Sequence, residues 1–242
     1  MRVNIKRFLN SKTWFETFKV EFKEDETILE LLDRLKNKER SLTYRSFCRS
    51  SICGTCAVRV NDKTVLACKS KVKDFLQNGE LVIEPVLRSK VIKDLVVKHD
   101  YIEEAIRKNK LWFEDEINPI QENLQTPEEL KKYDKQTDCI MCMACYFECE
   151  ALDYTPDFAG PFIFTKYFRF VFDSRDKSNK QQRIELAKEN GLYSCINCQK
   201  CIMVCPKEIA SAFDIKALQA KDSNPPTQDF GFGGFGMDFN SF

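Results

Sequence analysis

The spacing of the cysteines constrains this chain more than any other feature of its sequence. Residues 195–206, CINCQKCIMVCP, place four cysteines within eleven residues. An earlier run with the same spacing, CIMCMACYFEC, covers residues 139–149. Such C-x2-C steps bring sulfur atoms together on tight local loops, which favours metal or iron–sulfur ligation over disulfide bonds. We therefore expect a fold that is built around inorganic centres.

A third group of cysteines lies nearer the N-terminus and has a different spacing. It consists of Cys48, Cys53, Cys56 and Cys68. Its pattern, C-x4-C-x2-C…C, is typical of plant-type [2Fe–2S] ferredoxins. Arg45 and Arg49 add positive charge beside this loop, which favours the reduced state of a cluster. A four-cysteine zinc site is the alternative, although zinc sites seldom use the x4 step.

The two later runs are typical of a two-cluster ferredoxin domain. In such a domain the first three cysteines of each run bind one [4Fe–4S] cluster and the fourth binds the other cluster. The predicted ligands of the first [4Fe–4S] cluster are Cys139, Cys142, Cys145 and Cys205. The predicted ligands of the second are Cys195, Cys198, Cys201 and Cys149.

The rest of the composition excludes several classes of function. With 38 basic and 37 acidic side chains, the formal charge is +1, so no basic excess is present for binding nucleic acid. The N-terminal residues lack the apolar region and cleavage site of a signal peptide. No apolar run reaches the roughly 18 residues of a membrane helix, and the nearest, residues 161–172, is broken by two charges.

No catalytic site is expected on this chain. The one histidine, His99, is interpreted as a surface or packing residue. The segment GFGGFG at residues 231–236 matches a nucleotide-binding pattern, but neither a strand before it nor a helix after it is predicted.

A long stretch without cysteines, residues 69–138, separates the first group from the other two. This division, together with the strand and helix patterns given below and the ferredoxin spacings, predicts an α+β fold. Its N-terminal plant-type [2Fe–2S] ferredoxin (β-grasp) domain is followed by an all-α two-cluster ferredoxin domain. We expect the first domain over residues 1–100, a linker over 101–125, the helical domain over 126–220 and a disordered Gly/Phe-rich tail over 221–242.

Alternation and capping signals predict individual elements within these domains. MRVNIKRFL and TWFETFKVEF alternate as the strands of a hairpin, and CAVRVND and ELVIEPV predict further strands. Capping boxes at Thr27 and Thr126 predict the starts of two helices. A helix containing RIELAKEN is expected to end at Gly191, and residues 207–220 predict a final helix.

Five segments in this order resemble the iron–sulfur subunit of succinate dehydrogenases and fumarate reductases: CRSSICGTCAVRVNDKTVLAC, VIKDLVV, CIMCMACYFEC, YFRFVFDSRD and CPKEI. The resemblance extends from residue 1 to about residue 220. It implies a partner flavoprotein with covalent FAD and a membrane anchor that handles quinone. Electrons would pass from FAD through the [2Fe–2S] cluster and the first [4Fe–4S] cluster to the last cluster and quinone.

This sequence departs from that family at its last cluster and at the quinone end. Most members lack the cysteine that corresponds to Cys198 and hold a [3Fe–4S] cluster there. Because Cys198 supplies a ligand for the fourth iron, we expect one [2Fe–2S] and two [4Fe–4S] clusters, with [3Fe–4S] as the alternative if Cys198 is not a ligand. Glu150, Tyr154 and Ile196 replace the usual proline, tryptophan and histidine. Both departures resemble the non-classical branch, whose anchor is rich in cysteine like heterodisulfide reductase.

Two other functions fit the same residues. One is a free-standing multi-cluster ferredoxin, and the other is the iron–sulfur subunit of a thiol-linked fumarate reductase. The resemblance implies a peripheral position on the cytoplasmic side of the cytoplasmic membrane, with the periplasmic side, reached by export with a partner, as the alternative. In the tail, Phe230, Phe232 and Phe235 either belong to a disordered extension or dock on the anchor or the bilayer surface.

Overall fold

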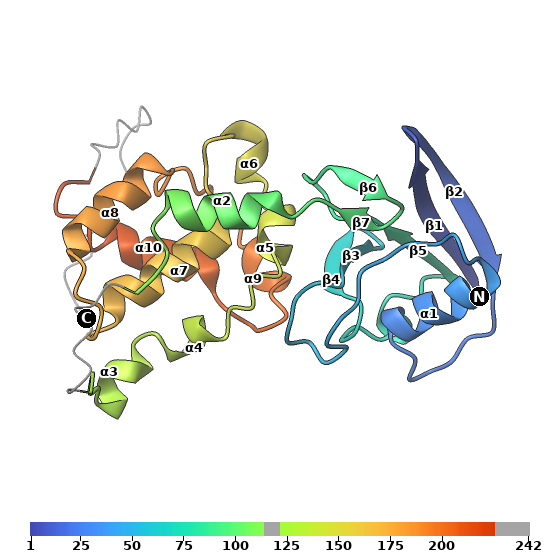
Figure 1. Cartoon of the computed structure of the whole chain (residues 1–242), viewed down its shortest axis with the longest axis horizontal. Coiled ribbons are helices and arrows are strands. Elements are labelled where there is room, and N and C mark those ends of the chain that lie inside the picture. Colours follow the sequence, from blue (N-terminus) through green and yellow to red (C-terminus); the bar gives the residue numbers. More distant parts are fainter. Residues whose placement is uncertain (114–121, 226–242) are drawn as a thin grey trace, which may run out of the picture.

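The computed structural model describes residues 1–113 and 122–225 of the chain. It contains a strand-rich part formed by the N-terminal residues and a helical part formed by the rest (Figure 1). In the figure the strands and helix α1 lie at the right, and helices α2 to α10 lie at the left. This α+β arrangement confirms the fold class that was predicted.

The N-terminal part is a five-stranded mixed sheet with the strand order β2-β1-β5-β3-β4. Its strands are β1 (Arg2–Leu9), β2 (Lys12–Lys19), β3 (Ala57–Val60), β4 (Lys63–Leu66) and β5 (Glu80–Glu84). Strands β1 and β2 form the predicted antiparallel hairpin, whereas β1 and β5 are parallel. A short 3-10 helix, η1 (Val72–Asp74), and a two-stranded sheet of β6 (Val91–Lys93) and β7 (Val96–Val97) complete this part.

Helix α1 (Ile28–Lys38) provides the core of the β-grasp domain. The predicted capping box is confirmed, because the Thr27 side chain accepts a hydrogen bond from the Glu30 backbone and the Glu30 carboxylate accepts one from the Thr27 backbone. The apolar positions at helical spacing, such as Ile28 and Leu35, are fully buried. Burying each such side chain contributes roughly 1.5–3 kcal/mol.

The helical part is arranged around helix α7 (Pro161–Phe172), which contacts α4, α5, α8 and α10. Its other elements are α2 (Asp100–Lys108), α3 (Pro127–Lys131), α4 (Asp134–Thr137), α5 (Ala144–Phe147), α6 (Ala151–Tyr154), α8 (Lys180–Glu189), α9 (Lys200–Met203) and α10 (Ser211–Gln219). The longest apolar run of the sequence is therefore a buried core helix. Within the described residues, no helix combines the length and apolar character needed to cross a membrane.

Helix α2 lies within the stretch that was expected to be a linker. The Tyr101 hydroxyl donates a hydrogen bond to the carbonyl of Ala159 at 2.7 Å. The Tyr167 hydroxyl of α7 donates to the Asn109 side chain at 3.0 Å. These contacts attach the described start of that stretch to the helical part.

Two expected boundaries differ in the structure. The final helix begins at Ser211 instead of residue 207, because Glu208 adopts a left-handed φ of 58° and the Ile209 N–H donates to the Cys205 sulfur at 3.3 Å. Residues 221–225 belong to the described chain, and Asp222 accepts a hydrogen bond from the Tyr193 hydroxyl at 2.9 Å. The rest of the expected tail, with its phenylalanines and GFGGFG, lies outside the described residues.

Polar contacts join the two parts along strand β4 and the loops beside it. The Thr64 N–H donates to the Glu148 carboxylate at 3.0 Å, and the Lys69 ammonium donates to the Pro206 carbonyl at 2.7 Å. Both acceptors are neighbours of cysteines in the helical part. The interface therefore holds the N-terminal cysteine loop against the two later runs.

Asp94 provides a test of the packing in the N-terminal part. Its buried carboxylate accepts hydrogen bonds from the Arg7 guanidinium at 2.8 Å and from the Thr43 N–H at 2.9 Å. Asp94→Asn removes the negative charge and replaces one accepting oxygen by an NH2 group, which then faces a hydrogen-bond donor, either the Arg7 guanidinium or the Thr43 N–H. We expect it to lower the free energy of unfolding by about 3–5 kcal/mol, measured by urea denaturation under anaerobic conditions.

The matched control is Asp62→Asn, which breaks the exposed ion pair between Asp62 and Arg59. This change should cost less than about 1 kcal/mol. Equal losses in the two variants would contradict the role assigned to Asp94.

Candidate iron–sulfur centres

Backbone N–H groups surround the sulfur of Cys48. The amides of Ser50, Cys53 and Ile52 donate to this sulfur at 3.4, 3.2 and 3.4 Å. Left-handed φ angles at Arg49 and other residues of the loop allow successive N–H groups to converge in this way. These hydrogen bonds, led by that of Ser50, lower the pKa of Cys48 to about 6. The thiolate, which is the form that binds iron, is therefore favoured at neutral pH.

The other residues of this loop have different surroundings. Burial raises the pKa of Cys56 to about 12. The Ser51 N–H donates to the Cys68 sulfur at 3.2 Å, so this second sulfur also accepts a hydrogen bond from a backbone amide. The Arg49 guanidinium forms an ion pair with Asp33. The positive charge that was expected from Arg49 is therefore largely compensated.

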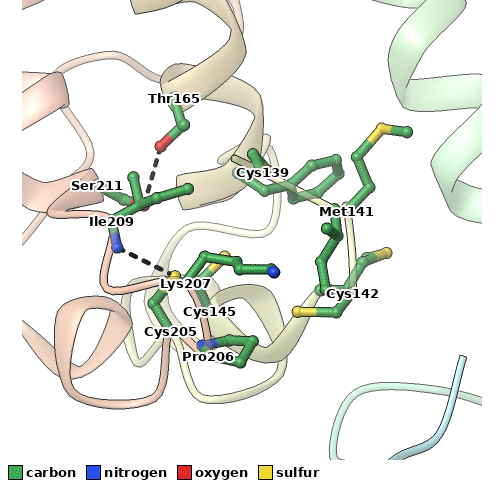
Figure 2. Close-up of a pocket in the computed structure, with 13 residues that line it drawn as sticks. Cys139, Met141, Cys142, Cys145, Thr165, Cys205, Pro206, Lys207, Ile209 and Ser211 are labelled. Atoms are coloured by element: carbon green, nitrogen blue, oxygen red, sulfur yellow. Dashed lines mark hydrogen bonds between the residues drawn. The ribbon is translucent and has the colours of Figure 1, made fainter. Parts of the chain in front are cut away.

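The second group of cysteines lines one cavity together with Cys205. The walls of this cavity are largely apolar (Figure 2). Its cysteines are Cys139, Cys142, Cys145 and Cys205. Apolar side chains close it, namely Ile140, Phe162, Pro206 and Ile209. The fourth cysteine of the last run thus lies with the first three of the middle run, which is the crossing that the spacing predicts.

The chemistry of this cavity suits an iron–sulfur cluster. Burial raises the pKa of Cys142 to about 12 and raises the pKa of Cys145 well above its ordinary value. A thiolate in such surroundings needs a nearby positive charge, and iron ions supply it. Two lysines lie close to this site: Lys207 lines the cavity, and the Lys166 ammonium donates to the Cys139 carbonyl at 3.0 Å.

The remaining cysteines form a second set in the helical part. It consists of Cys149, Cys195, Cys198 and Cys201. Burial, followed by repulsion from the other members of the set, raises the pKa of Cys201 to about 12 and that of Cys149 to about 11. The charges of the other three cysteines all raise the pKa of Cys201 after burial has done so.

The two runs have the same local backbone geometry. In the middle run Met141 and Met143 have left-handed φ angles of 52° and 60°, and in the last run Asn197 and Gln199 have 54° and 60°. A one-turn helix follows in each case, α5 and α9. Cys198 therefore occupies the backbone position that corresponds to Cys142. It differs in being exposed, whereas Cys142 is half-buried.

Contacts connect the three cysteine sets in a row. A methyl group at Gly54, in the N-terminal loop, would lie 2.8 Å from the Cys142 Cβ atom. Helix α5, which carries Cys145 of the middle run, also packs against α9, which carries Cys201 of the last run. The set around Cys139 is therefore the middle of the three.

The residues that replace the usual quinone-end side chains lie at the surface near the second helical set. Tyr154 is 81% exposed and Ile196 is half exposed. Glu150 forms an ion pair with Lys200 of α9. His99 lies outside all three sets at the start of α2, and burial lowers its pKa. No motif in the sequence indicates the side chains that back the cavity, Thr165 and Ser211.

Three cysteine sets in a row, in a plant-type ferredoxin domain joined to a two-cluster domain, define an iron–sulfur protein of electron transfer. Residues 2–104 match the family of 2Fe-2S iron-sulfur cluster binding domains. Residues 135–209 match the family of 4Fe-4S dicluster domains. The chain accordingly carries [2Fe–2S] and [4Fe–4S] clusters.

The chain is also similar to individual proteins whose complexes are named. It is 34% identical to the 8-methylmenaquinol:fumarate reductase iron-sulfur subunit of Wolinella succinogenes, over 90% of this chain and 72% of that protein. It is 35% identical to a subunit of the fumarate reductase (CoM/CoB) of Methanothermobacter marburgensis, over 86% of this chain but only 41% of that longer protein. Its fold matches a chain of the Mycobacterium smegmatis Sdh1 complex with a TM-score of 0.80 and 21% identity, covering 91% of this chain and 94% of that one.

The chain belongs to the family of iron–sulfur subunits of fumarate reductases and succinate dehydrogenases. It acts as an electron-transfer subunit of an oxidoreductase, as the resemblance implied.

Gly54 tests the contact between the first two sets. In Gly54→Ala the new methyl group meets Cys142 backbone and side-chain atoms within 3 Å, in addition to the strain of a φ of 72°. We expect destabilisation beyond the roughly 1–2 kcal/mol of left-handed strain, together with slower electron transfer between the two centres, measured by rapid-freeze EPR.

Gly79→Ala is the matched control, because Gly79 has a similar φ of 76° and no atom within 4 Å of the added methyl group. It should show the strain alone and normal electron transfer. If both variants behaved alike, the proximity of the two centres would not depend on Gly54.

Proposed function

We propose that this chain relays single electrons between a FAD-containing flavoprotein subunit and a membrane anchor that handles quinone, in a complex that interconverts succinate and fumarate. The observation that carries the proposal is the linear order of the three cysteine sets. In the middle set burial raises the pKa values of Cys142 and Cys145, whereas the loop around Cys48 in the first set and Cys198 in the last set lie at the surface. This is the arrangement that a relay needs, because electrons must enter and leave at exposed ends.

The proposed ligands follow the three sets. Cys48, Cys53, Cys56 and Cys68 hold the [2Fe–2S] cluster. Cys139, Cys142, Cys145 and Cys205 hold the first [4Fe–4S] cluster. Cys195, Cys198, Cys201 and Cys149 hold the second. When bound, these clusters supply one-electron redox chemistry, and the protein supplies thiolates, amide hydrogen bonds and burial.

The repeated loop geometry supports a ligand role for Cys198. Since its backbone position corresponds to that of Cys142, its sulfur is available to a fourth iron in the same manner. A [4Fe–4S] cluster at the end of the relay agrees with the non-classical branch and its cysteine-rich anchor.

Exposed apolar side chains mark both ends of the proposed relay. Beside Cys48, Phe47 is 82% exposed and Ile52 is 64% exposed. Tyr154, Ile196 and Met203 are exposed near Cys198. Apolar side chains gathered at a surface favour contact with another protein. We assign the first end to the flavoprotein and the second to the anchor, and we propose that the anchor holds the chain peripherally on the cytoplasmic side of the cytoplasmic membrane.

A thiol-linked fumarate reductase is the second candidate. It is favoured by the 35% identity with the subunit of M. marburgensis, whose name specifies CoM and CoB. Electrons would then pass through the same three clusters from a site that oxidises thiols to the flavoprotein.

Removal of Cys198 tests the nature of the last cluster. In Cys198→Ala, the cluster should lose the iron that this sulfur binds, and the oxidised protein should show a [3Fe–4S] EPR signal that the unaltered chain does not show. Ile196→Ala, in the same exposed loop, serves as the control and should leave the spectrum unchanged. Identical spectra for the unaltered chain and Cys198→Ala would remove Cys198 from the ligands.

The native complex distinguishes the two candidate functions. We expect affinity purification to recover a flavoprotein with covalent FAD and a cysteine-rich third subunit. The complex should reduce fumarate with a menaquinol analogue and not with the CoM and CoB thiols. Reduction by the thiols alone would favour the second candidate, and recovery of the chain without partners would contradict both.

A further inference from the structure

Helix α10 carries a buried carboxyl group that the proposed relay does not use. Asp214 is 3% exposed. One of its oxygens accepts a hydrogen bond from the Gln136 amide at 2.7 Å, and the other lies 2.8 Å from the Thr165 hydroxyl. Both neighbours are uncharged, so no ion pair in this group compensates an ionised Asp214. Burying a carboxylate without a compensating positive charge costs free energy, and protonation of the carboxylate removes that cost.

The group lies against the middle cysteine set. Thr165 and Ser211 line the cavity of that set, and Figure 2 shows the hydrogen bond between them. Burial raises the pKa of Cys139, and the negative charges of Cys205 and Asp214 act in the same direction. Burial raises the pKa of Asp214 itself to about 6. Its carboxyl group can therefore gain or lose a proton near neutral pH.

The hydroxyl groups beside Asp214 accommodate both of its protonation states. The Thr165 oxygen lies 2.8 Å from the carboxylate and 2.9 Å from the Ser211 hydroxyl, but it has only one hydrogen to donate. With Asp214 ionised, Thr165 donates to the carboxylate and accepts from Ser211. With Asp214 protonated, the carboxylic acid donates to Thr165, which then donates to Ser211. No polar atom loses its partner in either state.

We propose that Asp214 is a redox-linked proton acceptor, which takes up one proton as the cluster held by Cys139, Cys142, Cys145 and Cys205 gains one electron. The electron comes from the neighbouring centre of the relay. The proton comes from water and forms an O–H bond at the carboxylate oxygen that faces Thr165. Proton uptake offsets the added negative charge and raises the midpoint potential of the cluster. This inference rests on the proposed ligation of that cluster.

Other charged groups lie on the elements that pack around Asp214 and on the cavity wall. On α7, the Lys166 ammonium donates to the Cys139 carbonyl, and Arg169 acts on Lys166. On α4, which carries Gln136, the ionisable side chains Asp134 and Lys135 are exposed. On α10 itself, Lys216 acts on Cys195 of the second helical set. At the cavity itself, Lys207 lines the wall and the charge of Lys166 acts on Cys139, so these two lysines meet the cysteines and Asp214 there.

The test is an EPR-monitored redox titration of the native complex at several pH values, from about one unit below to about two units above the pKa of Asp214. Reduction raises this pKa, so the potential should fall as the pH rises through the range between the oxidised and reduced values. The steepest change is a tenfold change in the ratio of reduced to oxidised cluster per pH unit, or ~59 mV for one electron.

Asp214→Asn should abolish this pH dependence and keep the potential above that of the unaltered complex at high pH. The asparagine amide can donate to Thr165 as the protonated acid would, so the fold is preserved. Asp134→Asn, an exposed carboxyl on α4, is the matched control and should retain the full dependence. Thr165→Val, which removes a hydrogen bond to the ionised form, should move the pH-dependent range upward.

Infrared difference spectra provide an independent readout. The reduced-minus-oxidised spectrum should contain a carboxylic acid band that Asp214→Asn removes. A potential that does not change with pH in the unaltered complex, or equal slopes in the unaltered and Asp214→Asn complexes, would overturn the proposal. Failure of the proposed ligation would look different, because the titration would then show no [4Fe–4S] signal from this site, and both proposals would fall.

Discussion

The crossing of the two helical cysteine runs is the constraint on which the rest of the structure depends. Cys205 lies with the first three cysteines of the middle run, and Cys149 lies with those of the last run. Neither set can be completed until both runs have come together, so cluster binding and folding of the helical domain are coupled. Helix α7 supports this meeting, because it packs against α5 of the middle run and against α10, which follows the last run.

Burial and amide hydrogen bonds give individual cysteines of the three sets different electrostatic environments. Amide hydrogen bonds at the surface lower the pKa of Cys48, whereas burial raises the pKa values of Cys142 and Cys201. The same factors, hydrogen bonds to sulfur and solvent exposure, tune the potentials of iron–sulfur clusters. A relay with exposed ends and an enclosed middle can therefore assign a different potential to each step, and a carboxyl group behind the middle centre adds a dependence on pH.

Local sequence signals predicted much of this architecture. The hairpin, the capping boxes at Thr27 and Thr126, and the grouping of the helical cysteines depend on short-range patterns. What could not be predicted depends on contacts between distant residues. The Tyr101 hydroxyl of helix α2 donates a hydrogen bond to the carbonyl of Ala159. Helix α10 begins later in the sequence than expected, because the residues after Cys205 form a turn. The network of Asp214 joins three separate elements, so no spacing rule would have indicated it.

Mössbauer spectroscopy of the iron-labelled native complex, recorded in the oxidised and reduced states, tests the proposed set of three clusters most directly. Ligation by all three cysteine sets predicts the spectra of one [2Fe–2S] cluster and two [4Fe–4S] clusters per chain. Every iron of the two [4Fe–4S] clusters should be bound by a cysteine sulfur. A [3Fe–4S] component in the freshly prepared oxidised complex, in the same amount as the [2Fe–2S] cluster, would contradict this ligation. The last centre would then lack Cys198, and the relay would end as it does in the usual quinone-reducing members of the family.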